Sequence, residues 1–573
     1  MGGSRSRACN GHSSSGLALT PVLDAVAAAC PDRLALVFRD RRFSYADFAD
    51  RSWRFANALL AHGITIHTPR SELENWESGQ DHAAILMYNC NEYLESLVGC
   101  FKARAASINV NYRYVAEELR YILTNADTKA IVYHARFAPL VAEVLPDIQQ
   151  QRVLVQVADD SGNDLLPGAV DYEAFLQVSG QDPGLEYSPD DLHLLYTGGT
   201  TGMPKGVLWR QGDFLASHLG GKTKDGAIIT DIQTFVDRAR KSSGFGILPA
   251  TPFMHGIGQL ASLRAWTRGD YVVIPNHVDR LNPADLLTRA EAEKVAIVTI
   301  AGDAFARPLL TELRRNDYDL GALKYIITSG TMLSDASKAE LMSHLPDITI
   351  IDTIGASETG PHVEKTSHDP DSAYRKEFRI SEDSVVFNAN MTATLKPGHD
   401  GLGWFAIHSH IPLGYLGDET KTNQTFATFE GQRYVVTGDR VKLVGDGLIE
   451  FFGRDSLTIN SGGEKIFVEE VERALVAHAD VADAVVSSRP SERWGSEVVA
   501  LIVSASDGPV AVQSILEEAG KHVARYKLPK AIAFVDQIPR GSNGKADYKQ
   551  AKLIAGDCNR TVDVDRKTET VES

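Results

Sequence analysis

The segment from Val295 to Asp352 alternates apolar runs with amphipathic stretches, and this rhythm constrains the fold more than any other feature of the sequence. The apolar runs are VAIVTI, LKYIITSG and ITIID, and the stretches between them are ARPLLTELRRN and SDASKAELMSHL. Short apolar runs suit buried strands, and parallel strands need helical crossovers between them. Ser334, just before the second amphipathic stretch, is a good helix cap. The pattern therefore predicts β-α-β-α-β units around a parallel sheet.

Three different patterns of apolar and polar residues follow one another along the chain. Runs such as AAILMYN and KAIVYH continue the same alternation upstream, so the first two-thirds read as two large α/β subdomains. Short, turn-rich segments between Gly401 and Glu450 indicate a small β-rich subdomain. After Gly453 an amphipathic helix with Val468, Val471 and Leu475 on one face precedes further strands and helices. The sequence therefore predicts an α/β protein with a separate, small α+β domain at its C-terminal end.

Charge and cysteine content exclude several classes of function. The chain has 58 basic and 75 acidic residues, a net charge of −17, and its Lys and Arg residues are scattered, so binding to nucleic acid is not expected. Its five cysteines show no CxxC or CxxH spacing, which favours a reducing compartment without zinc. No stretch approaches the roughly 18 uninterrupted apolar residues of a spanning helix. We expect a soluble, cytoplasmic protein without an integral membrane segment.

The first sixteen residues are rich in Ser and Gly, contain Arg5 and Arg7, and lack acids. This composition has some features of an organellar transit peptide. A disordered tail is the alternative that we favour.

The string YTGGTTGMPKG, from Tyr196 to Gly206, is the most informative motif in the sequence. Its glycines let backbone N–H groups turn toward an anion, its hydroxyls add donors, and Lys205 adds positive charge. The string has no Walker A spacing, and no helix is expected after the lysine, so a kinase-type or GTPase-type loop is disfavoured. We interpret it as a loop that binds a polyphosphate. Its candidate ligands are Thr197, Gly198, Gly199, Thr200, Thr201, Gly202 and Lys205, of which Thr200 and Lys205 are also candidate catalytic residues.

This string resembles the adenylate-forming superfamily of acyl-CoA synthetases, peptide-synthetase adenylation domains and firefly-type luciferases. The resemblance covers nearly the whole chain, and it implies ATP, Mg²⁺ and coenzyme A as cofactor and co-substrates. Within the motif IGASETG it implies that Ser357 holds a phosphate oxygen and that Glu358 is catalytic and ligates magnesium. Ile354 stands where the family usually has an aromatic residue beside the adenine. Further ATP contacts implied by the resemblance are Ser329, Gly330, Thr331 and Asp352, with Asp439 and Arg454 at the ribose.

The C-terminal motifs complete the resemblance. In GRDSLTINSGGEKI it implies a hinge at Asp455 and Ser456, of which Ser456 stands where the family usually has Asp or Lys. It also implies a pantetheine path along Gly462 and Gly463. In PRGSNGKADY it implies that Lys545 reaches the substrate carboxylate and the α-phosphate as a catalytic residue. We predict a tail at residues 1–18, a large ATP- and acyl-binding domain at 19–453, a hinge at 454–456, an α+β domain at 457–555 and a polar tail at 556–573.

The acyl-binding residues are less well defined by the sequence. His255 and Gly302 stand where the family borders the acyl pocket, and a structural role is an equal alternative for this region. The run GIGQLA after His255 fits GxGxxA but has no strand before it, so a dinucleotide fold is rejected. The variant TGGTTG and the run GDAFARP resemble the bacterial branch that activates fatty acids and steroid side-chain acids. Segment 64–81 reads as a polar insertion without an assigned function.

The expected function is therefore an AMP-forming acyl-CoA ligase for a medium- or long-chain or steroid side-chain carboxylic acid. One alternative is an adenylating enzyme that loads a separate carrier protein. A second is a non-catalytic nucleotide-binding protein on the same fold, which the joint presence of Glu358, Asp439, Arg454 and Lys545 argues against. A luciferase-like oxygenase has no supporting residue. A homodimer is an open expectation.

Overall fold

The computed structural model of the chain describes residues 16–148, 153–197, 203–223, 225–330, 333–399, 401–461, 464–491, 495–505, 511–523, 525–541, 544–557 and 561–563. Within these ranges the side chains of Arg454, Ser456, Asn460, Glu464, Lys465, Val562 and Asp563 are not described.

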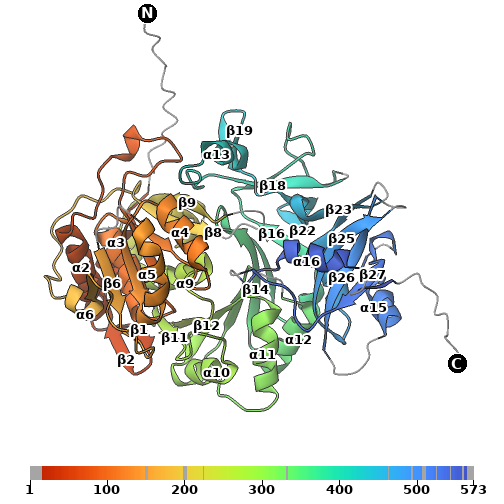
Figure 1. Cartoon of the computed structure of the whole chain (residues 1–573), viewed down its shortest axis with the longest axis horizontal. Coiled ribbons are helices and arrows are strands. Elements are labelled where there is room, and N and C mark those ends of the chain that lie inside the picture. The colour runs from red at the N-terminus through yellow and green to blue at the C-terminus, as the bar shows by residue number, and fades with distance from the viewer. Residues whose placement is uncertain are drawn as a thin grey trace, which may run out of the picture.

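A seven-stranded sheet forms the N-terminal part of the molecule, coloured red to yellow in Figure 1. Its strands pair in parallel except for the last two, which form an antiparallel hairpin. Most of these strands are buried along their whole length, as expected for short apolar runs covered on both faces. In spatial order they are β7 (Ala169–Asp171), β6 (Val153–Val157), β5 (Thr128–His134), β3 (His82–Leu86), β4 (Ala106–Asn109), β8 (Leu192–Thr197) and β9 (Lys205–Arg210).

A second, fifteen-stranded sheet contains the predicted parallel core. The core strands pair in parallel from β1 through β11, β10, β12 and β13 to β14. The β-rich segment continues the same sheet, because β22 pairs with both β21 and β16. In order the strands are β19 (Phe426–Phe429), β20 (Gln432–Val435), β18 (Gly403–His408), β21 (Asp439–Gly445), β22 (Leu448–Arg454), β16 (Glu377–Ile380), β15 (Gly360–Ser367), β14 (Thr349–Ala356), β13 (Tyr325–Thr328), β12 (Val295–Ile300), β10 (Gly246–Pro249), β11 (Tyr271–Ile274), β1 (Leu34–Phe38) and β2 (Arg41–Ser44), with β17 (Ser384–Phe387) on β18.

Helices cover these sheets, and the two that were predicted between β12 and β14 are present. Ser334 caps the second of them, since its Oγ accepts a hydrogen bond from the Ser337 N–H at 3.3 Å. No helix in the described ranges is long and apolar enough to cross a membrane. The helices of the large region are α1 (Leu19–Ala29), α2 (Tyr45–Ala61), α3 (Asn91–Lys102), α4 (Ala116–Asn125), α5 (Ala138–Val144), α6 (Tyr172–Phe175), α7 (Gln211–His218), α8 (Gln233–Lys241), α9 (Gly256–Trp266), α10 (Pro283–Ala292), α11 (Asp303–Leu313), α12 (Asp335–His344) and α13 (Glu419–Thr425). Short 3₁₀ turns are η1 (Arg70–Glu72), η2 (Ala135–Phe137), η3 (Leu145–Asp147), η4 (Asp371–Tyr374), η5 (Asp455–Leu457) and η6 (Arg525–Lys527).

The C-terminal part, blue in Figure 1, has its own sheets and its own core. Val468, Val471 and Leu475 are buried on one face of α14, as the sequence predicts. This core packs α14 against the strands of the C-terminal part. The chain passes from the fifteen-stranded sheet to these smaller sheets between β22 and β23. The elements are β23 (Thr458–Ser461), β24 (Glu464–Phe467), α14 (Val468–Val476), β25 (Val481–Ser491), β26 (Gly495–Ser504), α15 (Val512–Ala519), β27 (Ala531–Phe534), α16 (Tyr548–Gly556) and β28 (Val562–Asp563).

Glu472 of α14 makes the stability of the C-terminal part depend on pH. Burial raises the pKa of this carboxyl group to about 8, although the Val486 N–H donates to it at 2.8 Å and the Tyr548 hydroxyl at 3.1 Å. Between the unfolded pKa of about 4.3 and the folded value, only the unfolded chain loses the proton, so stability falls by about 1.4 kcal/mol for each pH unit as pH rises. Glu472→Gln is expected to abolish this loss.

The measurement is urea unfolding of the full chain at pH 5 and pH 8, followed through the transition that unfolds α14. The variant should be more stable than the wild type at pH 8, and its stability should change less between the two pH values. Glu517→Gln, at an exposed site on α15, is the matched control and should behave as the wild type. An equal pH dependence in wild type and Glu472→Gln would contradict the prediction.

Candidate active site

The predicted turns of the parallel core lie at one edge of the large sheet. Strands β12, β13 and β14 run in parallel, so Gly302 and Ser329 follow the carboxyl ends of adjacent strands. The Gly302 N–H donates to Thr328 Oγ1 at 3.0 Å, and the Thr353 hydroxyl donates to the Thr328 carbonyl at 3.1 Å. Gly302 has a φ of 56°, which favours glycine there. Ligands of open α/β sheets bind at this kind of edge.

Glu358 and Lys205 are brought together by a segment that the sequence analysis did not single out. The Tyr415 hydroxyl donates to Glu358 Oε1 at 2.7 Å. Lys205 Nζ lies 5.3 Å from the centre of the Tyr415 ring and 2.9 Å from Asp418 Oδ2. The side chains of Lys205 and Asp418 are 35% and 38% exposed, so this ion pair is weak enough for a phosphate to replace Asp418.

Ser357 lies beside the hairpin that β8 and β9 form. Its carbonyl oxygen accepts a hydrogen bond of 2.8 Å from Trp209 Nε1 on β9. Strand β9 is also hydrogen-bonded to the segment that carries Tyr415, because the Leu208 N–H donates to Gly414 O at 2.9 Å. The hairpin therefore positions Ser357, Glu358 and Lys205 in one region. The only signal for Tyr415 and Asp418 in the sequence is an aromatic and an acid among the glycines of PLGYLGDE.

The two residues expected at the ribose lie opposite each other on adjacent strands. Asp439 begins β21 and Arg454 ends β22, and the two are register partners. The Thr437 hydroxyl donates to the buried Asp439 carboxylate. Next along the chain, the Asp455 N–H donates to Gly438 O at 3.0 Å, so the expected hinge begins directly beside this turn.

Asp352, on β14, belongs to a cluster of charged side chains with residues of α12 and β15. Its Oδ2 lies 2.8 Å from Lys338 Nζ of α12, and Lys365 Nζ lies 3.5 Å from Asp335 in the same cluster. Burial raises the pKa of Asp352, while the two lysines oppose this effect. These contacts give Asp352 a structural role between α12 and the sheet, and contact with ATP stays a prediction.

Lys545 lies close enough to His255, the residue before α9, for its charge to act on that side chain. Burial lowers the pKa of His255 to about 4, and the positive charges of Lys545 and Arg113 add to this effect. His255 is therefore neutral at neutral pH. A Cβ placed on Gly544 would lie 3.5 Å from Arg113 Nη1, so the turn before Lys545 also touches the large region. On the other side, Arg307 Nη1 of α11 donates to Val481 O at 3.3 Å.

Several predicted site residues lie outside the described part of the chain or have undescribed side chains. The first group is Gly198, Gly199, Thr200, Thr201, Gly202, Thr331, Gly462 and Gly463, and the second is Arg454 and Ser456. The predicted tails lie mostly outside it as well.

Magnesium fits this site as an ion shared with a substrate. Among the described residues, no three His, Cys, Asp or Glu side chains gather into a preformed metal site. Glu358 provides one carboxylate, and Mg²⁺ is commonly held by one or two carboxylates together with substrate phosphates. The donor set therefore suits a magnesium–nucleotide complex.

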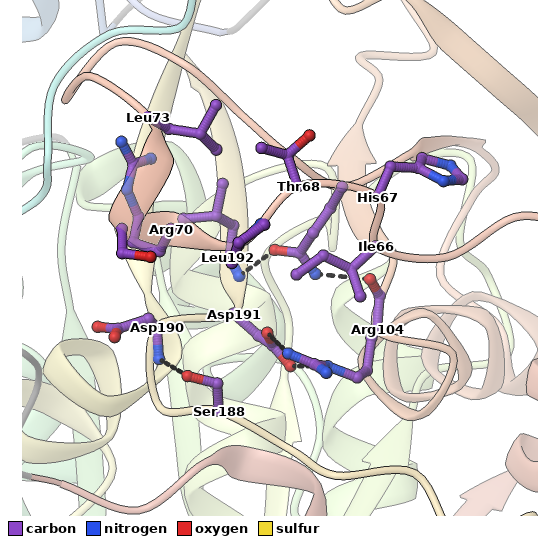
Figure 2. Close-up of a pocket in the computed structure, with 14 residues that line it drawn as sticks. Ile66, His67, Thr68, Arg70, Leu73, Arg104, Ser188, Asp190, Asp191 and Leu192 are labelled. Carbon is purple, nitrogen blue, oxygen red and sulfur yellow. Dashed lines mark hydrogen bonds and ion pairs between the residues drawn. The ribbon is translucent and has the colours of Figure 1, made fainter.

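The polar insertion at residues 64–81 forms one wall of a cavity of about 400 Å³ (Figure 2). Across it Arg104 makes a two-pronged ion pair with Asp191, at 2.7 and 2.8 Å. The cavity adjoins Leu192, the first residue of β8, whereas the phosphate loop follows the last. The insertion still supports the site, because the Trp76 carbonyl accepts a hydrogen bond of 2.8 Å from the Gly417 N–H, next to Asp418.

Comparisons with known proteins identify the family and agree with the fold. The family model described as AMP-binding enzyme matches residues 23–380, and that of the AMP-binding enzyme C-terminal domain matches residues 470–545. The chain is 46% identical over 533 residues to the medium-chain acyl-CoA ligase Mig of Mycobacterium avium, covering 93% of this chain and 97% of that protein. It is 35% identical to the 3-oxocholest-4-en-26-oate CoA ligase of Rhodococcus rhodochrous, covering 92% and 94%. The structure of the anthranilate CoA ligase AuaEII with anthranoyl-AMP matches with a TM-score of 0.78 at 20% identity, covering 94% and 97%.

Proposed function

We propose, since the chain belongs to the AMP-binding enzyme family, that it is an acyl-CoA ligase that activates a medium- or long-chain or steroid side-chain carboxylic acid. The observation that carries the proposal is the arrangement of charged residues from both parts of the chain. Lys205 and Glu358 lie together in the large region, and Lys545 approaches the same region beside His255. The assigned roles of these residues are part of the proposal.

In the first half-reaction a carboxylate oxygen of the acid attacks the α-phosphorus of ATP. A new P–O bond forms, the bond from the α-phosphorus to the bridging oxygen breaks, and pyrophosphate leaves with that electron pair. Lys545 stabilises the charge that develops on the carboxylate and the α-phosphate, and Lys205 binds the departing phosphates. Glu358 would hold Mg²⁺, which would supply positive charge to the phosphates. Asp439 and Arg454 bind the ribose.

In the second half-reaction the thiol of coenzyme A attacks the acyl carbon. The thiol loses its proton to solvent, a C–S bond forms, and the bond between the acyl carbon and the AMP oxygen breaks, so that AMP leaves with that electron pair. We place the thiol path along Gly462 and Gly463, so the Lys545 loop must move away between the two steps. A rotation of residues 457–555 against residues 19–453 about a hinge at 454–456 would achieve this exchange. The change of sheet after β22 supports this division.

The proposed function is tested with purified enzyme, Mg²⁺, ATP and a panel of short, medium, long and steroid side-chain acids. Mass spectrometry should detect AMP and the matching acyl-CoA in equal amounts. Acyl-adenylate that accumulates without thioester would instead identify a carrier protein as the acceptor. Absence of turnover with every acid would contradict the enzyme assignment.

Location in the cytoplasm and assembly as a homodimer remain predictions. The thiols of Cys30, Cys90 and Cys100 are free and buried, which suits a reducing compartment. Fractionation of the source cells and light scattering of the purified protein would test them.

A further inference from the structure

Helix α9 leaves one stripe of its surface accessible to solvent. Apart from Gly256 at its start, the other residues of the helix are buried. The accessible residues recur at intervals of three and four, the spacing of one helix face. They are Ile257, Leu260, Ala261 and Arg264, and we call them the α9 stripe.

The stripe begins at the candidate active site, and its surface changes from apolar to positively charged along its length. His255, beside Lys545, immediately precedes the helix. Ile257, Leu260 and Ala261 then provide an apolar surface. Arg264 is nine residues beyond His255, which corresponds to about 14 Å along a helix that rises 1.5 Å per residue. An apolar path therefore runs from the reacting centre to a cation.

Arg264 carries a charge that no described residue pairs with directly. Its guanidinium makes no hydrogen bond or ion pair with any described residue, whereas Arg268, one turn later, lies 3.5 Å from Asp270. Arg264 is exposed, yet burial lowers its pKa, so the group is reached by solvent while protein surrounds much of it. The carboxylate of Glu364 opposes this shift from β15.

The surroundings of Arg264 come from elements that meet at the far end of α9. The Thr267 hydroxyl, just after the helix, donates to Leu219 O at 3.0 Å. Next to Leu219, the ring of His218 lies 5.4 Å from that of His362 on β15. Leu260 and Ala261 pack against the same core as Ile297 of β12.

We propose that the α9 stripe binds the acyl chain and that Arg264 donates hydrogen bonds to an oxygen at the far end of the acid. This inference rests on the proposed acyl-CoA ligase activity and adds a substrate class: acids that carry a hydroxyl, oxo or carboxylate group remote from the reacting carboxylate. A plain fatty acid of the same length would cover the guanidinium with methylene groups and leave its donors unsatisfied. Sites built to hydrogen-bond a substrate group discriminate strongly against analogues that lack it.

The test compares dodecanoic acid, its omega-hydroxy derivative and dodecanedioic acid as substrates of the wild type, Arg264→Leu and Arg268→Leu. The wild type should prefer at least one of the oxygen-bearing acids over dodecanoic acid by at least tenfold in kcat/KM. Arg264→Leu should lose that preference through the KM for the acid, with the KM for ATP unchanged. Arg268→Leu should retain the preference. Comparison of the two oxygen-bearing acids distinguishes a neutral acceptor from a second carboxylate.

Arg264→Gln, which retains donors and most of the side-chain length, provides a second variant if the leucine variant folds poorly. It should keep part of the preference for the hydroxy acid. Equal kcat/KM for all three acids in the wild type, or a preference that survives in Arg264→Leu, would overturn the inference while leaving the ligase assignment intact. Failure of every acid to form acyl-CoA would overturn the proposed function itself.

Discussion

Lys545→Ala is expected to lower the rate of acyl-adenylate formation by about a hundred- to a thousand-fold, the usual effect of removing one preorganised group that stabilises transition-state charge. The physical reason is its position. Lys545 comes from a turn of the C-terminal part and faces the large region beside a neutral His255. Because His255 is neutral, it adds no positive charge beside the place where the carboxylate and the α-phosphate would meet Lys545. The measurement is carboxylate-dependent exchange of pyrophosphate into ATP.

The same variant should leave the second half-reaction nearly intact. Supplied with synthetic acyl-adenylate and coenzyme A, Lys545→Ala should form thioester within about threefold of the wild-type rate, a difference under 1 kcal/mol. Lys549→Ala, at an exposed position of the adjacent helix α16, is the matched control and should affect neither step. Equal losses in both half-reactions would contradict a role confined to adenylation.

Glu358→Gln is expected to lower kcat for adenylation by about a hundredfold and to raise the Mg²⁺ concentration required for half-maximal activity. Glutamine keeps an oxygen that can accept the Tyr415 hydroxyl hydrogen bond, so this change removes the charge with little change of shape. A neutral amide is a poorer ligand for a hard cation than a carboxylate. The measurement is pyrophosphate exchange across a Mg²⁺ titration.

Tyr415→Phe measures the contribution of the hydrogen bond to Glu358 separately from that of the Glu358 charge. It removes the donor to Glu358 and retains the carboxylate, so the expected loss is about tenfold, the worth of one hydrogen bond to a charged group. Glu364→Gln, on β15 beyond the loop that carries Glu358, should leave the Mg²⁺ requirement unchanged. A wild-type Mg²⁺ requirement in Glu358→Gln would contradict its assignment as the metal ligand.

The parallel core was predictable because its signals are local. Each strand from Val295 to Asp352 is a short apolar run, and each crossover helix has its own amphipathic pattern and, before α12, its own cap at Ser334. The pairing of β16 with β22 has no such signal. It joins segments about seventy residues apart, and local pattern does not identify which strand pairs with which. The sequence therefore indicated a β-rich subdomain but not that it extends the α/β sheet.

In the candidate site, too, features with a local sequence signal were predictable and contacts between distant segments were not. The phosphate loop is a compact string, so Lys205 could be proposed from its composition, whereas the role of Glu358 in the SETG motif was implied by the family resemblance. Tyr415 and Asp418 contact those residues only through tertiary pairing of their segment with β9. The salt bridge of Asp352 with Lys338 joins a strand to a helix packed on it, and a single acid in the sequence does not reveal its partner. The family resemblance implied that Lys545 reaches the substrate carboxylate, but it did not predict that the charge of Lys545 acts on His255.

The most direct test of the central claim, that the chain activates a carboxylate as an acyl-adenylate, follows the carboxylate oxygen itself. A substrate acid labelled with ¹⁸O in both carboxylate oxygens is converted with ATP, Mg²⁺ and coenzyme A, and the products are analysed by mass spectrometry. The account predicts one ¹⁸O atom in each AMP and one in each acyl-CoA, because the acyl C–O bond breaks in the second step. Unlabelled AMP, or label released in inorganic phosphate together with ADP, would contradict it.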